Sequence, residues 1–231
     1  MSFLHSETEL QAAMVALVAQ DPRLAPVLQK AGMPALRRRE AGYAGLCHIV
    51  CGQQLSTASA GAIRARLFAA FDPFHHDAIR LARNDRLARL GLSKPKIKSL
   101  KAIAQAIAKG RIDLDAVGRM EADAAHAALT TLHGIGPWTA DIYLLFCLGN
   151  ADAWPAGDLA LQEAARIAFA MKRRPDAKAM VKLAEPWRPW RGVAAHLLWA
   201  YYHAVKRREG APVPAAVGSV VTKPKRKRNG R

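Results

Sequence analysis

The stretch LHGIGPWTA, residues 132–140, decides how this chain is expected to fold. Two glycines, Gly134 and Gly136, flank an aliphatic residue, which is the pattern of a tight turn between two helices. Pro137 suits the first position of the second helix, because an N–H group is not needed there. The turn and the helix start expose backbone amides, which can bind a phosphate without a charged side chain. The stretch therefore predicts a helical hairpin with a phosphate-binding turn.

The composition around this stretch favours a helical protein. The chain has 231 residues, of which 51% are apolar, enough for one substantial core or two small lobes. Alanine and leucine dominate, whereas β-branched and aromatic residues are sparse, and helices favour that balance. The apolar stretches are far shorter than the roughly 20 residues of a membrane span. Glu7 and Glu9 stand where a signal peptide would be basic. We therefore expect an all-α protein without a membrane segment.

Caps and breakers divide the chain into helical segments. Ser6 and Glu9 have the spacing of a capping box, and Pro34 and Pro73 mark later breaks. One long helix, interrupted in character around residues 52–56, is expected to carry its apolar face on Leu46, Ile49, Val50, Leu55, Ala58 and Ala62. Further helices are expected over residues 6–20, 21–30, 77–83, 85–90, 95–109, 121–132, 137–148, 158–170, 176–184 and 191–206.

Positive charge is the strongest clue in the composition. The formal net charge is +17 at pH 7. Six lysines and arginines lie within residues 223–231, and without them the net charge is still +11. A polyanion is the natural partner of such a chain, because each phosphate contact releases condensed counterions. Together with the hairpin, the charge favours DNA binding over an ordinary helical corner. The hairpin residues predicted to bind DNA are Gly134, Ile135, Gly136 and Thr139.

Four further segments accompany the hairpin in a fixed order. They are IVCGQQLS at residues 49–56, LGLS at 90–93, AWPAGDL at 153–159 and WRPWR at 187–191. In this order and spacing they resemble the helix-hairpin-helix DNA glycosylase superfamily, and within it most closely the 3-methyladenine DNA glycosylase II family. The resemblance covers about residues 20–205. An ordered set of this kind is far more specific than any single motif.

The resemblance implies a two-lobed, all-α domain over residues 1–210 with the active site in the cleft between the lobes. The middle lobe would span about residues 41–150, and the other lobe would combine residues 1–40 with 151–210. Residues 211–231 are rich in proline, valine and lysine without an amphipathic period, so we expect a basic disordered tail. Some relatives carry an additional N-terminal sheet domain, and we expect none here because the residues before the GQQLS segment read as helical.

The resemblance also assigns chemistry to Asp158, which follows the loop AWPAG. Taken alone, an aspartate in this place would be interpreted as a helix N-cap. In the glycosylases that this chain resembles, the carboxylate faces C1′ of a nucleotide flipped out of the duplex, and the two roles are compatible. Breaking an N-glycosidic bond builds positive charge on the sugar, which a fixed anion stabilises. The implied activity is hydrolytic removal of alkylated purines such as 3-methyladenine in base excision repair.

Trp138 indicates which reaction to expect, and the cysteines and histidines indicate which cofactors to expect. Strand-cleaving members of the superfamily carry a lysine at the position of Trp138, so we expect base removal without strand cleavage. Cys147 is the only cysteine after residue 51, which leaves too few ligands for the iron–sulfur cluster of another branch. The eight histidines show no metal spacing, and His75-His76 is expected to be an inert surface pair. We expect no cofactor and no metal, apart from a monovalent cation held by backbone carbonyls of the hairpin.

The resemblance assigns Trp138 and Trp199 to the base pocket. An electron-rich ring can hold a purine that alkylation has made cationic. Trp187 and Trp190 fit core packing better.

A flipped base leaves a gap in the duplex that a side chain must fill. In the family this side chain comes from the loop that matches Gln53, Gln54, Leu55 and Ser56, so we expect these four residues to contact DNA. Gln54 aligns best with the wedge and Leu55 second. One of the two glutamines is expected instead to satisfy backbone groups at a helix kink.

The expected partner is double-stranded DNA that contains damaged bases, bound by a monomer in the cytoplasm at the nucleoid. Cys47, Cys51 and Cys147 are an odd number without framework spacing, which favours a reducing compartment. Two alternatives stay open. One is a glycosylase for another lesion, such as an oxidised or deaminated base. The other is a helix-hairpin-helix protein that binds DNA without cutting it, and Asp158 argues against that, because such a protein has no use for a carboxylate beside phosphates.

Overall fold

The computed structural model describes residues 2–206, which share one contiguous hydrophobic core. Within this range the regular elements are helices, and the only β-type pairing is an isolated bridge between Phe3 and Asn150. The prediction of an all-α fold is confirmed. The predicted basic tail, residues 211–231, lies outside the described residues. No helix between residues 2 and 206 is long and apolar enough to cross a membrane.

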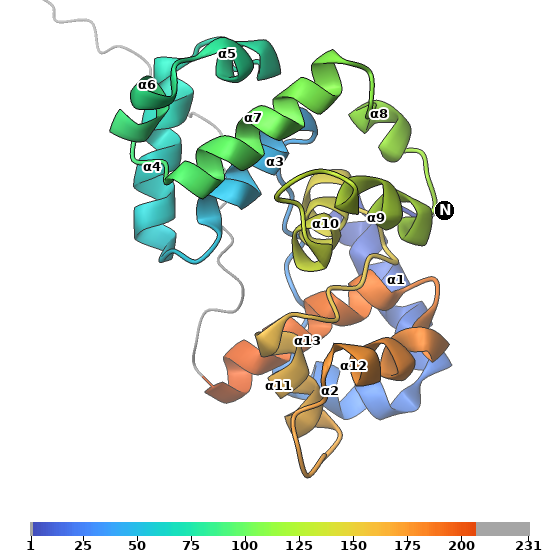
Figure 1. Cartoon of the computed structure of the whole chain (residues 1–231). Helices are drawn as coiled ribbons and strands as arrows, with labels where there is room; N and C mark the ends of the chain where they lie inside the picture. Colours follow the sequence, from blue (N-terminus) through green and yellow to red (C-terminus); the bar gives the residue numbers. More distant parts are fainter. Residues whose placement is uncertain (1, 207–231) are drawn as a thin grey trace, which may run out of the picture.

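Figure 1 colours the elements by their order along the chain, from blue at the N-terminus to red. The first are α1 (Glu7–Gln20), η1 (Pro22–Leu24) and α2 (Ala25–Ala31). The middle of the chain forms α3 (Gly42–Gly52), α4 (Thr57–Ala70), α5 (His76–Leu81), α6 (Asn84–Arg89), α7 (Lys94–Ala108), α8 (Leu114–Val117), α9 (Ala122–Thr130), α10 (Pro137–Ile142) and η2 (Tyr143–Leu148). The last are α11 (Leu159–Ala168), α12 (Ala177–Ala184), η3 (Glu185–Trp187) and α13 (Arg191–Lys206).

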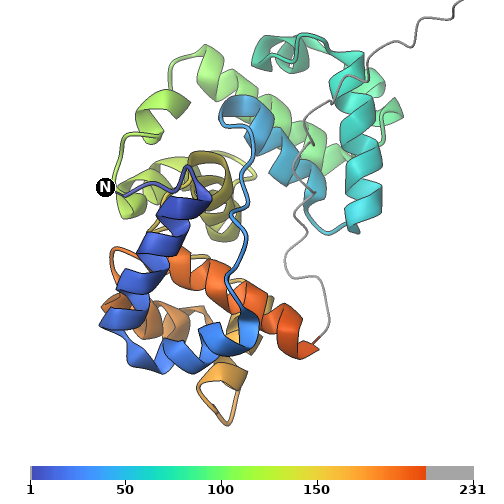
Figure 2. The same cartoon turned by 180° about the vertical axis from the view of Figure 1, so that it is seen from behind.

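The helices gather into two groups, which Figure 1 shows one above the other. In the first group, α7 packs against α3, α5 and α6, while α3 also packs against α4 and η2. In the second group, α13 packs against α1, α2 and α11. The view from behind in Figure 2 shows α1 and α2 beside α13 as well. The second group therefore combines the beginning and the end of the described chain, and the first group is inserted between them.

A network of charged side chains joins α9 to the start of α13. Arg191 is only 5% exposed, and its guanidinium pairs with Asp152 at 2.8 Å and with Asp123 on α9 at 2.9 Å. Arg188 contacts the same two carboxylates at 3.0 and 2.6 Å. Arg191 and Asp152 are largely buried, whereas the Asp123 side chain is 67% exposed, so solvent screens the part of the network that reaches α9. This network holds the hairpin helix α9 against the loop that leads to α11.

The long helix predicted around residues 46–62 is two helices, α3 and α4, and the interruption predicted within it at residues 52–56 is a turn. Gln54 adopts φ +56°, which a regular helix does not allow. Ser56 then begins α4 as an N-cap whose Oγ accepts the Ser59 amide proton at 3.2 Å. The predicted apolar face holds only for α3: Leu46, Ile49 and Val50 are buried, Leu55 is half-buried, and Ala58 and Ala62 are exposed.

Two smaller differences lie on either side of the hairpin. The one-turn helix α8 was not among the predicted helices, and it begins where Asp113 Oδ1 accepts the amide protons of Asp115 and Ala116. The segment predicted as one helix over residues 137–148 is an α-helix, α10, that continues as the π-helix η2. Gly149 ends η2 with φ +77°.

Candidate active site

Asp158 lies at the N-terminus of α11, directly after the loop formed by residues 153–157. Its backbone is extended, and its Oδ1 accepts the amide protons of Ala160 and Leu161, each at 3.0 Å. The residue is 6% exposed. The N-cap interpretation is therefore confirmed, and the cap fixes the orientation of the carboxylate.

Two tryptophans complete the surroundings of this carboxylate. Trp138 Nε1 donates to Asp158 Oδ2 at 2.9 Å, and Trp199 Nε1 donates to Asp158 Oδ1 at 3.2 Å. Trp138 belongs to α10 in the first group of helices, whereas Trp199 belongs to α13 in the second. The carboxylate thus lies where the two groups meet. It receives four N–H donors, three on Oδ1 and one on Oδ2, which suits an anion with one oxygen still open to a ligand.

The two tryptophans assigned to the base pocket differ in exposure. Trp138 is half-buried. Trp199 is 2% exposed, and its ring stacks on Phe146 at 5.3 Å and meets His196 edge-on at 6.4 Å. In this structure Trp199 therefore packs in the core and positions the carboxylate, and its ring has no free face for a base. Trp187, expected in the core, is fully buried.

The hairpin turn joins α9 to α10, and its two glycines serve different needs. Gly134 has φ +87°, and a Cβ there would collide with Ser99 of α7. Gly136 is exposed at φ −85°, and a Cβ there would meet no atom within 4 Å. The fold itself therefore requires glycine at position 134 but not at 136. A glycine that the fold does not need is what close approach of another molecule to the backbone would explain.

Two of the hairpin residues predicted to bind DNA point inward. Ile135 is 4% exposed, and its amide donates to the Leu132 carbonyl at 3.0 Å. Thr139 is 3% exposed, and its Oγ1 accepts from Gln53 Nε2 at 3.0 Å. The Thr139 hydroxyl is therefore held within the protein, and only the backbone of Thr139 could meet DNA. For Ile135 only the backbone can take part.

The turn between α3 and α4 separates the roles of its glutamines. Gln53 joins this turn to the hairpin by donating to the Thr139 hydroxyl, a side-chain group, whereas the prediction was a glutamine bonded to backbone groups. Gln54 is exposed and has φ +56°, a conformation that costs a non-glycine residue about 1–2 kcal/mol. Leu55 is half-buried, and Ser56 caps α4. Gln54 and Ser56 are thus the exposed residues of the turn, and Ser56 is occupied as the cap.

Gln162 supports the site although the sequence analysis did not single it out. It is 6% exposed on α11, and its Nε2 donates to the Ala156 carbonyl at 3.0 Å, in the loop just before Asp158. A glutamine four residues after the N-cap, on the apolar face of an amphipathic helix, was the available signal.

A second buried carboxylate, Asp141, lies on α10 three residues after Trp138. It is 8% exposed, and His126 Nε2 of α9 lies 3.7 Å from its Oδ1. Burial raises the pKa of the Asp141 carboxyl to about 8, and the charge of Asp123 adds to this, while Arg191 acts in the opposite direction. Asp141 is therefore protonated at neutral pH.

The chain was compared with known proteins. Residues 47–189 match the model of the HhH-GPD superfamily of base excision DNA repair proteins. A DNA-3-methyladenine glycosylase of Bacillus subtilis is 28% identical over 68% of this chain. A probable bifunctional transcriptional activator/DNA repair enzyme AlkA of Mycobacterium tuberculosis is 33% identical over 81%. The chain spans 56% and 39% of the lengths of these two relatives. The 3-methyladenine DNA glycosylase Mag1 of Schizosaccharomyces pombe, solved in complex with abasic DNA, superposes with a TM-score of 0.71 at 27% identity, covering 84% of this chain and 97% of that one.

Proposed function

The chain belongs to the HhH-GPD superfamily of base excision DNA repair proteins, and on this premise we propose that it is a DNA-3-methyladenine glycosylase. It binds double-stranded DNA and hydrolyses the N-glycosidic bond of alkylated purines such as 3-methyladenine. Asp158 is its catalytic carboxylate. The observation that carries the proposal is the position of Asp158, held by four N–H donors between the two groups of helices.

The chemistry follows from the geometry of this carboxylate. As the bond between base and sugar breaks, positive charge develops on the sugar, as in the transition states of glycoside hydrolysis. A negative charge that is already fixed in place stabilises this charge without reorganisation. Oδ2 takes a single donor, from Trp138, so it is the oxygen free to face C1′ or to orient the attacking water. Trp138 stands where a lyase would need an amine, so the product is an abasic site on an unbroken strand.

Two turns form the proposed DNA-binding face. The backbone of Gly134, Ile135 and Gly136 approaches a phosphate at the start of α10, which Gly136 permits because nothing in the protein fills the space beside it. The neighbouring turn is tied to the hairpin through the bond between Gln53 and Thr139. That bond fixes where Gln54 enters the duplex when a nucleotide is flipped out. Gln54 is therefore the proposed wedge.

The base itself is proposed to lie against the half-buried ring of Trp138. A purine alkylated at a ring nitrogen is cationic, so an aromatic face attracts it more than it attracts an undamaged base. The same charge weakens the N-glycosidic bond, and selection and catalysis then favour the same lesions.

Three further properties belong to this proposal. Backbone carbonyls of the hairpin turn hold a monovalent cation that itself faces a DNA phosphate. The carbonyl of Leu132 already accepts the Ile135 amide proton, so the exposed turn residues that follow would supply the ligands. At constant ionic strength, DNA affinity should then be higher in potassium than in tetramethylammonium salts.

The protein acts as a monomer, in the cytoplasm at the nucleoid.

A base-release assay tests the proposal. Duplexes that carry methylated purines, hypoxanthine or 8-oxoguanine are incubated with the full chain, and the freed bases are identified by chromatography. We expect release of 3-methyladenine and 7-methylguanine, with strand breaks only after alkali. Release of 8-oxoguanine alone would move the assignment to another lesion. Tight binding of all three duplexes without release of any base would leave a DNA-binding protein.

A further inference from the structure

The segment that leads from α4 into α5 carries two histidines and an aspartate in succession. His75 is the N-cap of α5 with an extended backbone, and His76 and Asp77 are its first two residues. The segment is anchored by Phe74, whose ring stacks on Phe68 at 4.1 Å and on Tyr43 at 5.8 Å. The His76 ring meets Tyr43 edge-on at 6.2 Å. These contacts restrict how far the segment can move. None of the residues belongs to the site around Asp158.

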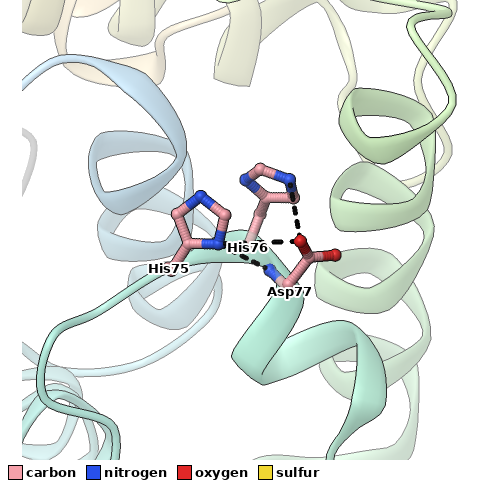
Figure 3. A group of neighbouring side chains, drawn as sticks. All are labelled: His75, His76 and Asp77. Carbon is pink, nitrogen blue, oxygen red and sulfur yellow. Dashed lines mark hydrogen bonds and ion pairs between the residues drawn. The ribbon is translucent and has the colours of Figure 1, made fainter.

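Figure 3 shows the two imidazole rings and the carboxylate gathered around one point. Asp77 Oδ2 lies 3.9 Å from His75 Nδ1 and 3.8 Å from His76 Nε2. One donor atom from each of the three residues falls within 4.8 Å of the others, and between residues 2 and 206 this is the one such group of three. In a tetrahedral zinc site with bonds of about 2.0–2.2 Å, ligand atoms are about 3.3–3.5 Å apart. Small side-chain rotations would close the difference.

The groups around Asp77 orient its carboxylate for metal binding. Arg80 Nε donates to Asp77 Oδ1 at 2.7 Å, which leaves Oδ2 directed at the imidazoles. A partner of this kind orients a metal-binding carboxylate, although its positive charge weakens the attraction for a cation. His75 Nδ1 accepts the Asp77 amide proton at 3.3 Å, a long bond that a metal would replace.

We propose that His75, His76 and Asp77 form a binding site for a divalent transition-metal ion of the zinc class. Two imidazole nitrogens and one carboxylate oxygen are the ligands that zinc, nickel and copper prefer, whereas magnesium and calcium require oxygen ligands. The side chains are partly exposed, at 59%, 19% and 43%, so water completes the coordination. The site is separate from base excision, and its occupation ties the start of α5 together. The expectation of an inert histidine pair rested on sequence spacing, which did not include the aspartate.

Calorimetric titration of the full chain, without a histidine tag, with zinc chloride tests the proposal. We expect one site in the wild type, no measurable site in His75→Gln or His76→Gln, and at least about tenfold weaker binding in Asp77→Asn. His5→Gln, at an exposed histidine elsewhere, is the matched control and should bind as the wild type does. The three cysteines are buried, so they do not compete in the folded protein.

Copper provides a second readout that does not depend on the strength of zinc binding. The electron paramagnetic resonance spectrum of the copper-loaded chain should show coupling to two imidazole nitrogens, and to one in His75→Gln. Circular dichroism of each variant should match the wild type, so a lost signal cannot be attributed to unfolding. The proposal is wrong if zinc does not bind the wild type, if the three variants bind it undiminished, or if the copper spectrum is unchanged in His75→Gln.

Discussion

Asp158 at the start of α11 and Asp141 on α10 are both buried carboxylates, yet their surroundings differ in kind. Asp158 accepts four N–H donors from its own helix and from two tryptophans. Asp141 faces His126 at 3.7 Å, and burial raises its pKa to about 8. Burial alone therefore does not prepare a carboxylate for catalysis, because the buried group without donors takes up a proton. What distinguishes the catalytic candidate is the set of donors that matches its charge.

The largest expected effect comes from Asp158→Asn. The substitution is nearly isosteric and keeps a good N-cap, so the fold and DNA binding should persist. The negative charge facing the sugar is lost, which should lower the single-turnover rate of base release by about a hundredfold or more. The loss should be greater for neutral bases such as hypoxanthine than for 7-methylguanine, whose bond already breaks readily.

Asp176→Asn is the matched control for this substitution. Asp176 caps α12 with Oδ1 accepting the Ala179 amide proton at 2.8 Å, so it shares the cap but not the tryptophans. Its variant should excise bases at the wild-type rate. If Asp158→Asn also excises bases at the wild-type rate, Asp158 is only a helix cap. The N–H donors that distinguish Asp158 from Asp141 would then not indicate a catalytic carboxylate.

A smaller effect is expected from Trp138→Phe, which removes the one donor to Oδ2 and keeps an aromatic ring. A hydrogen bond to a charged group is worth about 1.5–3 kcal/mol, so base release should slow by about ten- to a hundredfold. Trp190→Phe, at another half-buried tryptophan, is the control and should leave the rate unchanged. An unchanged rate in Trp138→Phe would mean that the indole donor does not position the carboxylate. The affinity of the variant for a duplex with an abasic site is measured as well. An unchanged affinity would show that a slower release comes from the chemical step and not from weaker DNA binding.

Asp141→Asn should leave base release unchanged and alter the pH dependence of stability. The raised pKa means that the folded protein keeps a proton which the unfolded chain loses above pH 3.8, its ordinary value. Stability from this group is thus complete below pH 3.8 and is lost as the pH rises to about 8, by at most about 1.4 kcal/mol per pH unit. Denaturant titrations between pH 5 and about pH 9 should show a flatter profile in the variant. An unchanged profile would contradict a protonated Asp141.

The smallest effect is expected from His126→Gln. At 3.7 Å the contact with Asp141 is loose, and a protonated carboxyl gains little from a nearby imidazole, so stability at pH 7 should change by less than about 1 kcal/mol. The same denaturant titration measures it. A larger loss would indicate an ion pair, and Asp141 would then resemble Asp158 more than the structure suggests.

Much of this molecule is determined by local sequence. Ser6 and Glu9 form the capping box that the spacing predicts, and Asp158 caps the helix after the hairpin. Gly134 adopts a positive φ in the predicted turn. Such features depend on residues three or four apart, within one turn of helix, so the sequence alone is enough to place them.

Contacts between elements were decided only by the tertiary structure. Trp138 and Trp199 are 61 positions apart in the sequence, yet both donate to Asp158, because α13 packs on α11 and the Trp138 side chain of α10 reaches the start of α11. Thr139 belongs to a motif typical of a DNA contact, but the neighbouring turn buries it against Gln53. The pattern of a helix indicates which face is apolar and not which partner will cover it. Packing of the whole core determines which elements meet, and it therefore determined which groups hold the Asp158 carboxylate.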